Sequence, residues 1–69
     1  MIKEIKIENE YIKLDSLLKL SDVVSTGGQA KYYILDGKVI VNGEVTEQRG
    51  KKIRVGDIVE VDGVKIKIV

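Results

Sequence analysis

The stretch TGGQAKYYILDGKVIVNGEV at residues 26–45 predicts a helix followed by a hairpin, and this succession decides the fold. Thr26 and Gln29 have the spacing of a capping box, in which the threonine hydroxyl bonds the amide three residues on and the glutamine side chain reaches back. Gly37 supplies a left-handed stop. Between these signals the apolar residues recur at helical spacing, at Ala30, Tyr33 and Ile34. We therefore expect a helix over about residues 26–36.

Two hairpins are predicted after this helix. Asn-Gly at residues 42–43 and Asp-Gly at residues 62–63 each stand between two apolar runs. Both dipeptides favour a type I′ turn, because both central residues of that turn take a positive φ. In the last run Lys65 and Lys67 alternate with apolar residues, which is typical of a strand with one buried face.

The N-terminal third adds a strand and another helix. Residues 2–7 alternate in part between apolar and charged side chains and end at a polar run, which predicts a strand. From residue 14 to about residue 20, leucines at i, i+3 and i+4 predict a short helix. The predicted order is β-α-α-β-β-β-β, an α+β fold within a single domain, residues 1–69.

The composition excludes most catalytic and cofactor chemistry. The 69 residues include no cysteine and no histidine, so disulfides, thiolate sites and the commonest general base and metal ligand are missing. The acidic residues show no spacing typical of a catalytic pair. We therefore expect a protein that is not an enzyme and that uses no cofactor, no metal and no small-molecule substrate.

The apolar runs are short. The longest extends from Tyr32 to Leu35, whereas a helix that spans a bilayer needs about 20 apolar residues. The chain opens with no signal-peptide pattern. We expect no membrane partner and a cytoplasmic location.

The basic residues gather in the middle of the chain. The net charge is only +1, but residues 31–56 carry six basic side chains against three acids. Part of this excess lies in the polar segment between the hairpins, at Arg49, Lys51 and Lys52. Such a segment is either a solvated loop or a contact for a polyanion, and both interpretations stay open.

Two adjacent glycines in the first helical turn also have two explanations. Gly27 and Gly28 each cost about 0.5–1 kcal/mol relative to alanine, so a small domain should keep them only where a Cβ is unwelcome. Either this turn packs closely against the preceding helix or connector, or an anion lies against the bare amides at the helix start. The segment is not a phosphate loop of the nucleotide-binding type, because it lacks the spacing G-x-x-x-x-G-K-[ST].

Four motifs together resemble a known family. They are Lys13-Leu14-Asp15-x-x-Leu18, Thr26-x-x-x-Ala30-Lys31, Gly37-x-Val39-x-Val41-Asn42-Gly43 and Gly56-Asp57-x-Val59. In this combination, over roughly residues 12–62, the chain resembles the RNA-binding domain first described in bacterial ribosomal protein S-four. The segment 26–31 and the basic segment around Lys51 are similar to its stand-alone YaaA/YbcJ-like subgroup.

The resemblance implies two short helices packed on a small bent antiparallel sheet, the αL RNA-binding motif. The helix pair and the following hairpin would form one face for structured RNA. Gly27 stands where many members have an arginine, so backbone amides and the bases of the polar segment would replace that charge. The RNA-binding residues expected on this basis are Lys13, Thr26, Gly27, Gly28, Gln29, Lys31, Asn42, Arg49, Lys51 and Lys52.

The expected partner is structured RNA, which the resemblance narrows to ribosomal RNA or a ribosomal subunit of a bacterium. The role implied is ribosome assembly or translation, and we expect a monomer. Three tyrosines provide little base stacking, so contacts to phosphates and sugar hydroxyls are expected. Charge alone does not distinguish RNA from DNA. The alternative is a DNA-associated or protein-interaction module linked to replication or repair.

Overall fold

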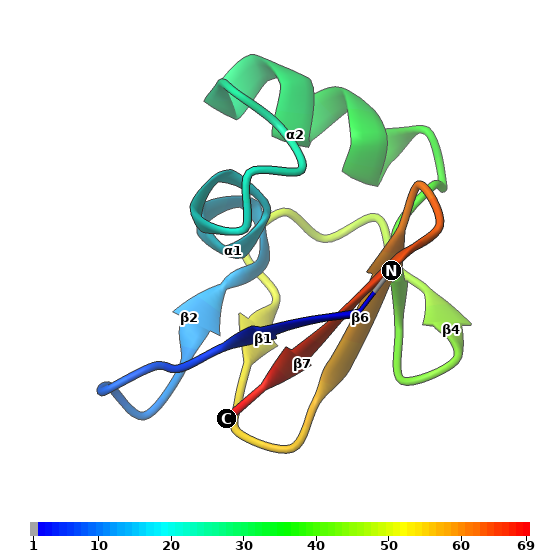
Figure 1. The fold of residues 1–69 in the computed structure, drawn as a ribbon. Helices are drawn as coiled ribbons and strands as arrows, with labels where there is room; N and C mark the ends of the chain where they lie inside the picture. The colour runs from blue at the N-terminus through cyan, green and yellow to red at the C-terminus, as the bar shows by residue number, and fades with distance from the viewer. Residues whose placement is uncertain (1) are drawn as a thin grey trace.

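The computed structural model describes residues 2–69, which form two short helices and seven short strands (Figure 1). Met1, the first residue of the predicted domain, lies outside them. In chain order the elements are β1 (Ile2–Ile5), β2 (Ile12–Lys13), α1 (Leu14–Leu20), α2 (Gly27–Leu35), β3 (Ile40–Val41), β4 (Glu44–Val45), β5 (Lys52–Ile53), β6 (Ile58–Val61) and β7 (Val64–Ile68). Both predicted helices are confirmed, the second being one residue shorter at each end. Within the described part of the chain, neither helix is long and apolar enough to span a membrane.

Five strands form a mixed sheet and two form a separate antiparallel pair. The order in the larger sheet is β1-β7-β6-β3-β4, and β2 pairs with β5. The α+β class is confirmed, but the expectation of an antiparallel sheet is wrong at one edge, where β1 lies parallel to β7. Alternation of apolar and charged residues specifies the buried face of a strand and not its neighbour. The prediction also misses β2 and β5, because strands of two residues are too short to show a period of two.

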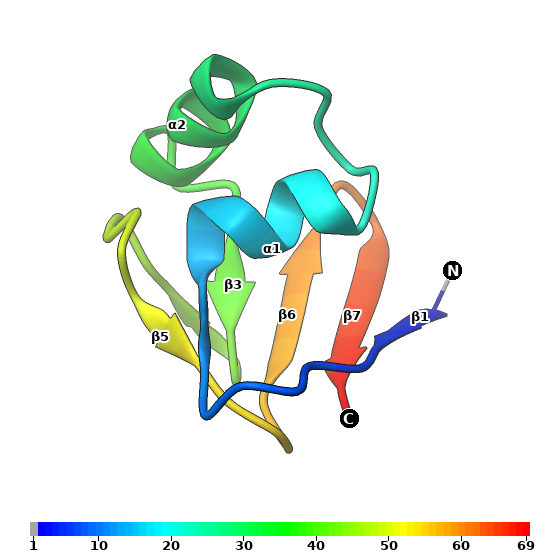
Figure 2. The same ribbon diagram turned by 90° about the vertical axis from the view of Figure 1, so that its left-hand side faces the viewer.

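The core lies between the larger sheet and the two helices, which cover one of its faces (Figure 2). The leucines predicted at helical spacing all point into it, since Leu14, Leu17 and Leu18 are fully buried. The other buried members are Val24, Ala30, Ile34, Val39, Val41, Ile53, Val59, Val61, Ile66 and Ile68. Burying one valine or leucine side chain contributes about 1.5–3 kcal/mol, so these residues supply the main driving force for folding.

Both hairpin turns have the predicted geometry. Asn42 and Gly43 have φ angles of 51° and 85°, and Asp62 and Gly63 have φ angles of 53° and 76°. Two successive positive φ angles define a type I′ turn, whose twist matches that of the flanking strands. The turns therefore fix the register of β3 with β4 and of β6 with β7.

The ends of α2 follow the predicted signals with one difference. Oγ1 of Thr26 accepts a hydrogen bond from the amide of Gln29 at 3.1 Å, whereas the Gln29 side chain accepts from Ser25 and not from Thr26. At the other end Gly37 has a φ of 73°, and its amide donates to a carbonyl of the last turn at 3.2 Å. These caps fix where α2 begins and ends.

Candidate nucleic-acid interface

The strand pair β2–β5 joins two basic segments that are far apart in the sequence. Lys13 and Lys52 are direct partners in its antiparallel register, so their side chains leave the same face of the pair. Ile12 and Ile53 are the other partners, and Ile53 is fully buried. The apolar partners therefore hold the pair on the core, and the two lysines face the solvent.

Backbone carbonyls of the polar segment around Arg49 and Lys51 accept hydrogen bonds from the first amides of α1. The amide of Leu14 donates to the carbonyl of Lys51 at 3.0 Å, and the amide of Asp15 donates to the carbonyl of Arg49 at 3.2 Å. The backbone of this segment is thus occupied, while its side chains are left for other contacts. The segment lies beside Lys13, and we call the resulting group the basic cluster: Lys13, Arg49, Lys51 and Lys52.

The basic cluster makes no ion pair with an acid in residues 2–69. The ion pairs found there join Lys38 to Asp36 at 3.6 Å and Lys65 to Glu60 at 3.5 Å. Three members of the cluster are exposed and Lys51 is half-buried. The cluster is therefore a group of like charges that the fold does not neutralise.

Tyr11 positions one member of the basic cluster, and sequence reasoning missed it. The Nζ atom of Lys52 lies 5.0 Å from the centroid of the Tyr11 ring. Such a cation–π contact contributes about 0.5–1 kcal/mol at an exposed site. A signal exists in the sequence, because Tyr11 stands two residues before Lys13 and residues two apart in a strand share a face.

The start of α2 carries amides that the chain leaves open. The cap between Thr26 and Gln29 uses one amide, but those of Gly27 and Gly28 have no hydrogen-bond partner in the described residues. A Cβ at Gly27 would meet no atom within 4 Å, and one at Gly28 would meet only Oγ1 of Thr26 at 3.8 Å. Close packing therefore does not explain the two glycines, and that predicted alternative is wrong.

Lys31 lies one turn beyond the glycines. It is exposed, and helical spacing places it four residues after Gly27 and three after Gly28, on the same side of α2. Helical side chains lean toward the N-terminus of their helix. The Lys31 charge therefore adds to the positive end of the helix dipole and to the open amides.

The basic cluster and the start of α2 open on the same side of the molecule. In Figure 1 the start of α2, α1 and β2 lie one below the other on the left. Figure 2 shows this side facing the viewer, with α2 above α1 and β5 below it. The elements that carry the two groups therefore lie on either side of α1.

Asn42 is held by the fold. Its Oδ1 accepts from the amide of Ile58 at 2.9 Å, and its Nδ2 donates to Asp57 at 3.1 Å. Asp57 accepts in turn from the amide of Arg54 at 2.8 Å. Asn42 thus ties the β3–β4 hairpin to the turn before β6, and its contact with RNA stays a prediction.

Tyr32 and Tyr33 have different environments. Tyr33 packs against the core, as its place on the apolar stripe predicts. Hydrogen bonding toward the Asp62 carboxylate and the negative charge of that group raise the pKa of Tyr33. Tyr32 is 77% exposed. A single exposed ring on α2 does not form a platform for several stacked bases.

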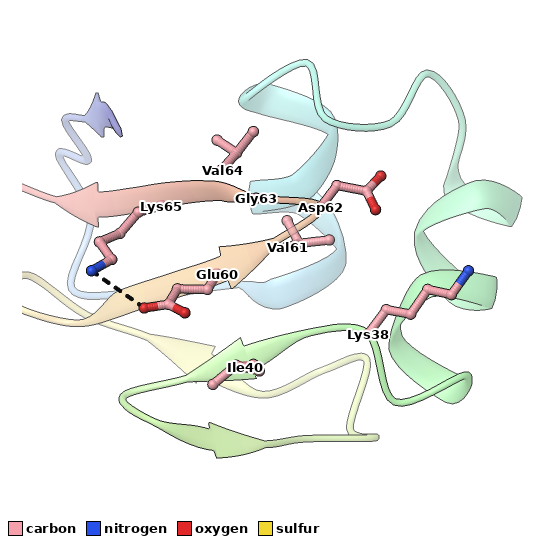
Figure 3. Close-up of a pocket in the computed structure, with 8 residues that line it drawn as sticks. All are labelled: Lys38, Ile40, Glu60, Val61, Asp62, Gly63, Val64 and Lys65. Carbon is pink, nitrogen blue, oxygen red and sulfur yellow. Dashed lines mark ion pairs between the residues drawn. The ribbon is translucent and has the colours of Figure 1, made fainter. Parts of the chain in front are cut away.

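A hollow of about 190 Å³ lies where α2 ends, away from the open amides (Figure 3). Its lining residues are Lys38, Ile40, Glu60, Val61, Asp62, Gly63, Val64 and Lys65. Two lysines and two acids balance its charge, and one lysine is paired with Glu60. A balanced hollow of this kind does not attract a polyanion, so it is not part of the candidate interface.

Comparison with known proteins identifies the family. Residues 5–69 match the S4 domain. Probable ribosome maturation protein RlbA of Bacillus subtilis (strain 168) is 44% identical over 63 residues, which cover 91% of this chain and 89% of that relative. The solution structure of YbcJ from E. coli, described as revealing an αL motif involved in RNA-binding, is 31% identical with a TM-score of 0.71. That match covers 99% of this chain and 85% of YbcJ. The chain therefore belongs to the S4 domain family.

Proposed function

We propose that this protein binds structured RNA through the basic cluster and the start of α2, and that it catalyses no reaction. The observation that carries the proposal is the direct pairing of Lys13 with Lys52 across β2–β5. Like charges directly opposite each other destabilise a strand pair. No acid in the described part of the chain forms an ion pair with either lysine. A polyanion that lies against both lysines would remove their repulsion.

Phosphate is the chemical group that this surface fits best. Lysine and arginine side chains form charge-assisted hydrogen bonds with phosphate oxygens, and open amides at a helix start bind anions. The surface offers spaced positive groups and few exposed rings. This combination favours folded RNA, held through phosphates and sugar hydroxyls, over a single strand held by stacking.

Ribosomal RNA, free or within a ribosomal subunit, is the partner that we propose. The relative from B. subtilis is named a ribosome maturation protein, and YbcJ is described by a motif involved in RNA-binding. The first description favours a role in ribosome assembly or translation, and the second favours RNA binding; we propose that this role is exercised in the bacterial cytoplasm. We propose that the chain acts there as a single domain and a monomer.

A salt-dependent titration against matched RNA and DNA tests the binding proposal. The protein is titrated with a stem-loop from ribosomal RNA and with a DNA hairpin of the same sequence, between about 50 and 200 mM salt. The RNA affinity should fall steeply with salt and exceed the DNA affinity throughout. Constant RNA affinity over this range would contradict phosphate contact. Tighter binding to the DNA hairpin would support the DNA-associated alternative.

Sedimentation with ribosomal particles tests the proposed partner. Tagged protein is centrifuged with purified small and large ribosomal subunits and with assembly precursors, at low salt. We expect it to sediment with one class of particle and to be released as the salt concentration rises. Equal recovery with every particle would show charge-driven attachment without a ribosomal site.

A further inference from the structure

A second hollow, which we call the hairpin notch, lies next to the basic cluster. Its volume is about 420 Å³, within the range of about 300–1,000 Å³ typical of small-ligand sites. Its lining residues are Val41, Asn42, Glu44, Val45, Thr46, Gln48 and Lys51. Lys51 belongs to both the notch and the cluster. A ligand in the notch and a polyanion on the basic cluster would therefore both lie against Lys51.

Hydrogen bonds fix the walls of the hairpin notch. The amide of Thr46 donates to the carbonyl of Val39 at 3.1 Å, and Oγ1 of Thr46 accepts from the amide of Gln48 at 3.3 Å. The amide of Lys51 donates to the carbonyl of Gln48 at 3.2 Å. On the facing wall the Asn42 side chain is held by the turn before β6. The notch is thus formed before any ligand arrives, which lowers the cost of binding.

The side chains of the notch suit the base of a nucleotide. Glu44 is exposed and forms no ion pair within residues 2–69, although Lys51 lines the same notch. An ionised carboxylate only accepts hydrogen bonds, so a ligand that displaces water from Glu44 must offer a donor. Glu44 pairs directly with Val41, another residue of the notch, and shares its face, whereas the side chain of Val45 leaves the other face of the hairpin. A flat base with a donor edge can therefore bond Glu44 inside the notch.

We infer that the hairpin notch receives one unpaired nucleotide from RNA that is bound on the basic cluster. Its base donates a hydrogen bond to Glu44, and its phosphate lies near Lys51. This inference rests on the proposed RNA-binding function. Proteins read RNA sequence mainly at bulges and loops, where unstacked bases turn outward.

Glu44 makes the notch selective for bases with an amino group. Carboxylates accept hydrogen bonds from the amino group of cytosine, and guanine offers a ring N–H beside its amino group. Uracil offers one N–H between two carbonyl oxygens, which would face the carboxylate. The notch therefore selects guanine, adenine or cytosine over uracil.

Stem-loop RNAs that differ only in one bulged nucleotide test this inference. The probes carry a bulged G, A, C or U, and a fully paired stem-loop is the reference. They are titrated with the wild type, with Glu44→Gln and with Glu47→Gln. Glu47 is an exposed acid of the same loop that does not line the notch, so both variants lose one negative charge. The readout is the ratio of the affinities for bulged G and bulged U, which a change of net charge alone does not alter.

The wild type should bind bulged G about tenfold more tightly than bulged U, as one hydrogen bond to a charged group provides. Glu44→Gln should reduce this ratio to about twofold or less, because its amide pairs with either base, whereas Glu47→Gln should keep the wild-type ratio. No preference in the wild type, or an unchanged preference in Glu44→Gln, would overturn the inference. Binding of the paired reference keeps the two proposals apart. Salt-dependent binding of that reference without base preference refutes only the notch, whereas no binding of any probe refutes the RNA-binding proposal as well.

Discussion

The two helices of this protein begin in opposite ways. At the start of α1 the amides of Leu14 and Asp15 donate to the carbonyls of Lys51 and Arg49, so the chain itself supplies their acceptors. At the start of α2 the amides of Gly27 and Gly28 have no partner among residues 2–69. A helix start thus serves as framework where the chain supplies its acceptors, and as a binding surface where the acceptors must come from a ligand.

The segment that caps the start of α1 also carries the basic side chains that lie near the start of α2. The carbonyls that cap α1 belong to Arg49 and Lys51, so the same residues turn their backbone inward and their basic side chains outward. The result is a basic cluster on one side of α1 and open amides on the other (Figure 2). Five substitutions separate these roles.

Ile53→Ala should have the largest effect, because it removes the buried anchor that holds β5 and the capping segment against α1. Replacing a buried isoleucine by alanine costs about 2–5 kcal/mol of unfolding free energy. Denaturant unfolding measures the loss. Val55→Ala is the matched control, since Val55 is 63% exposed and its truncation should change stability by about 0.5 kcal/mol or less. Equal losses in the two variants would contradict the anchoring role of β5.

Asn42→Ala should destabilise the fold by about 1–3 kcal/mol, because it removes two hydrogen bonds, from the amide of Ile58 and to Asp57, each of which contributes about 0.5–1.5 kcal/mol. Unfolding experiments measure this effect, with Asn9→Ala at an exposed bend as the control. RNA titrations of the folded variant complete the comparison. Unchanged stability together with weaker RNA binding would assign Asn42 to the interface and not to the framework.

Lys13→Ala and Lys52→Ala should each weaken RNA binding and lower the slope of log affinity against log salt by about one. The melting temperature of Lys13→Ala should stay the same or rise slightly, since it removes one half of a like-charge pair. That of Lys52→Ala should change little, because the relief of the same repulsion is offset by the loss of the contact with the Tyr11 ring. Lys67→Ala is the control, because Lys67 is an exposed lysine on the sheet face that the helices do not cover. If Lys67→Ala lowered the salt slope of RNA affinity by as much, RNA binding would depend on the net charge of the protein and not on the basic cluster.

Gly28→Ala should have the smallest effect and the most specific one. The new methyl group meets only Oγ1 of Thr26 at 3.8 Å, so stability should stay equal or improve by up to about 1 kcal/mol through helix propensity. RNA affinity should fall, because the methyl group stands beside the amides that meet the phosphate. Thermal melts and an RNA titration measure both effects. A more stable variant with wild-type affinity would remove Gly28 from the interface.

Local patterns predict most of this fold, and long-range backbone contacts explain what they miss. The cap at Thr26, the stop at Gly37 and the leucines of α1 act over a few residues, so the sequence shows them directly. The parallel edge strand β1 and the capping of α1 depend on backbone groups that are far apart in the chain. Every residue carries such groups, so no pattern of side chains marks them.

The same distinction applies to the candidate site. The basic residues and the glycine pair could be predicted, because charge and glycine are visible in a sequence. That Lys13 lies opposite Lys52 follows only from the β2–β5 register. The hydrogen bond from Asn42 to Asp57 could not be predicted from the sequence either, because it joins two separate turns.

The most direct test is an NMR titration of the backbone amides with a ribosomal stem-loop RNA at low salt. The amides of Gly27 and Gly28 should show the largest shifts, because they gain a phosphate acceptor, and residues of the basic cluster should shift with them. The amides of Leu14 and Asp15 should shift less, since carbonyls already occupy them. Shifts confined to the uncovered face of β6 and β7, with both glycines unchanged, would contradict the account.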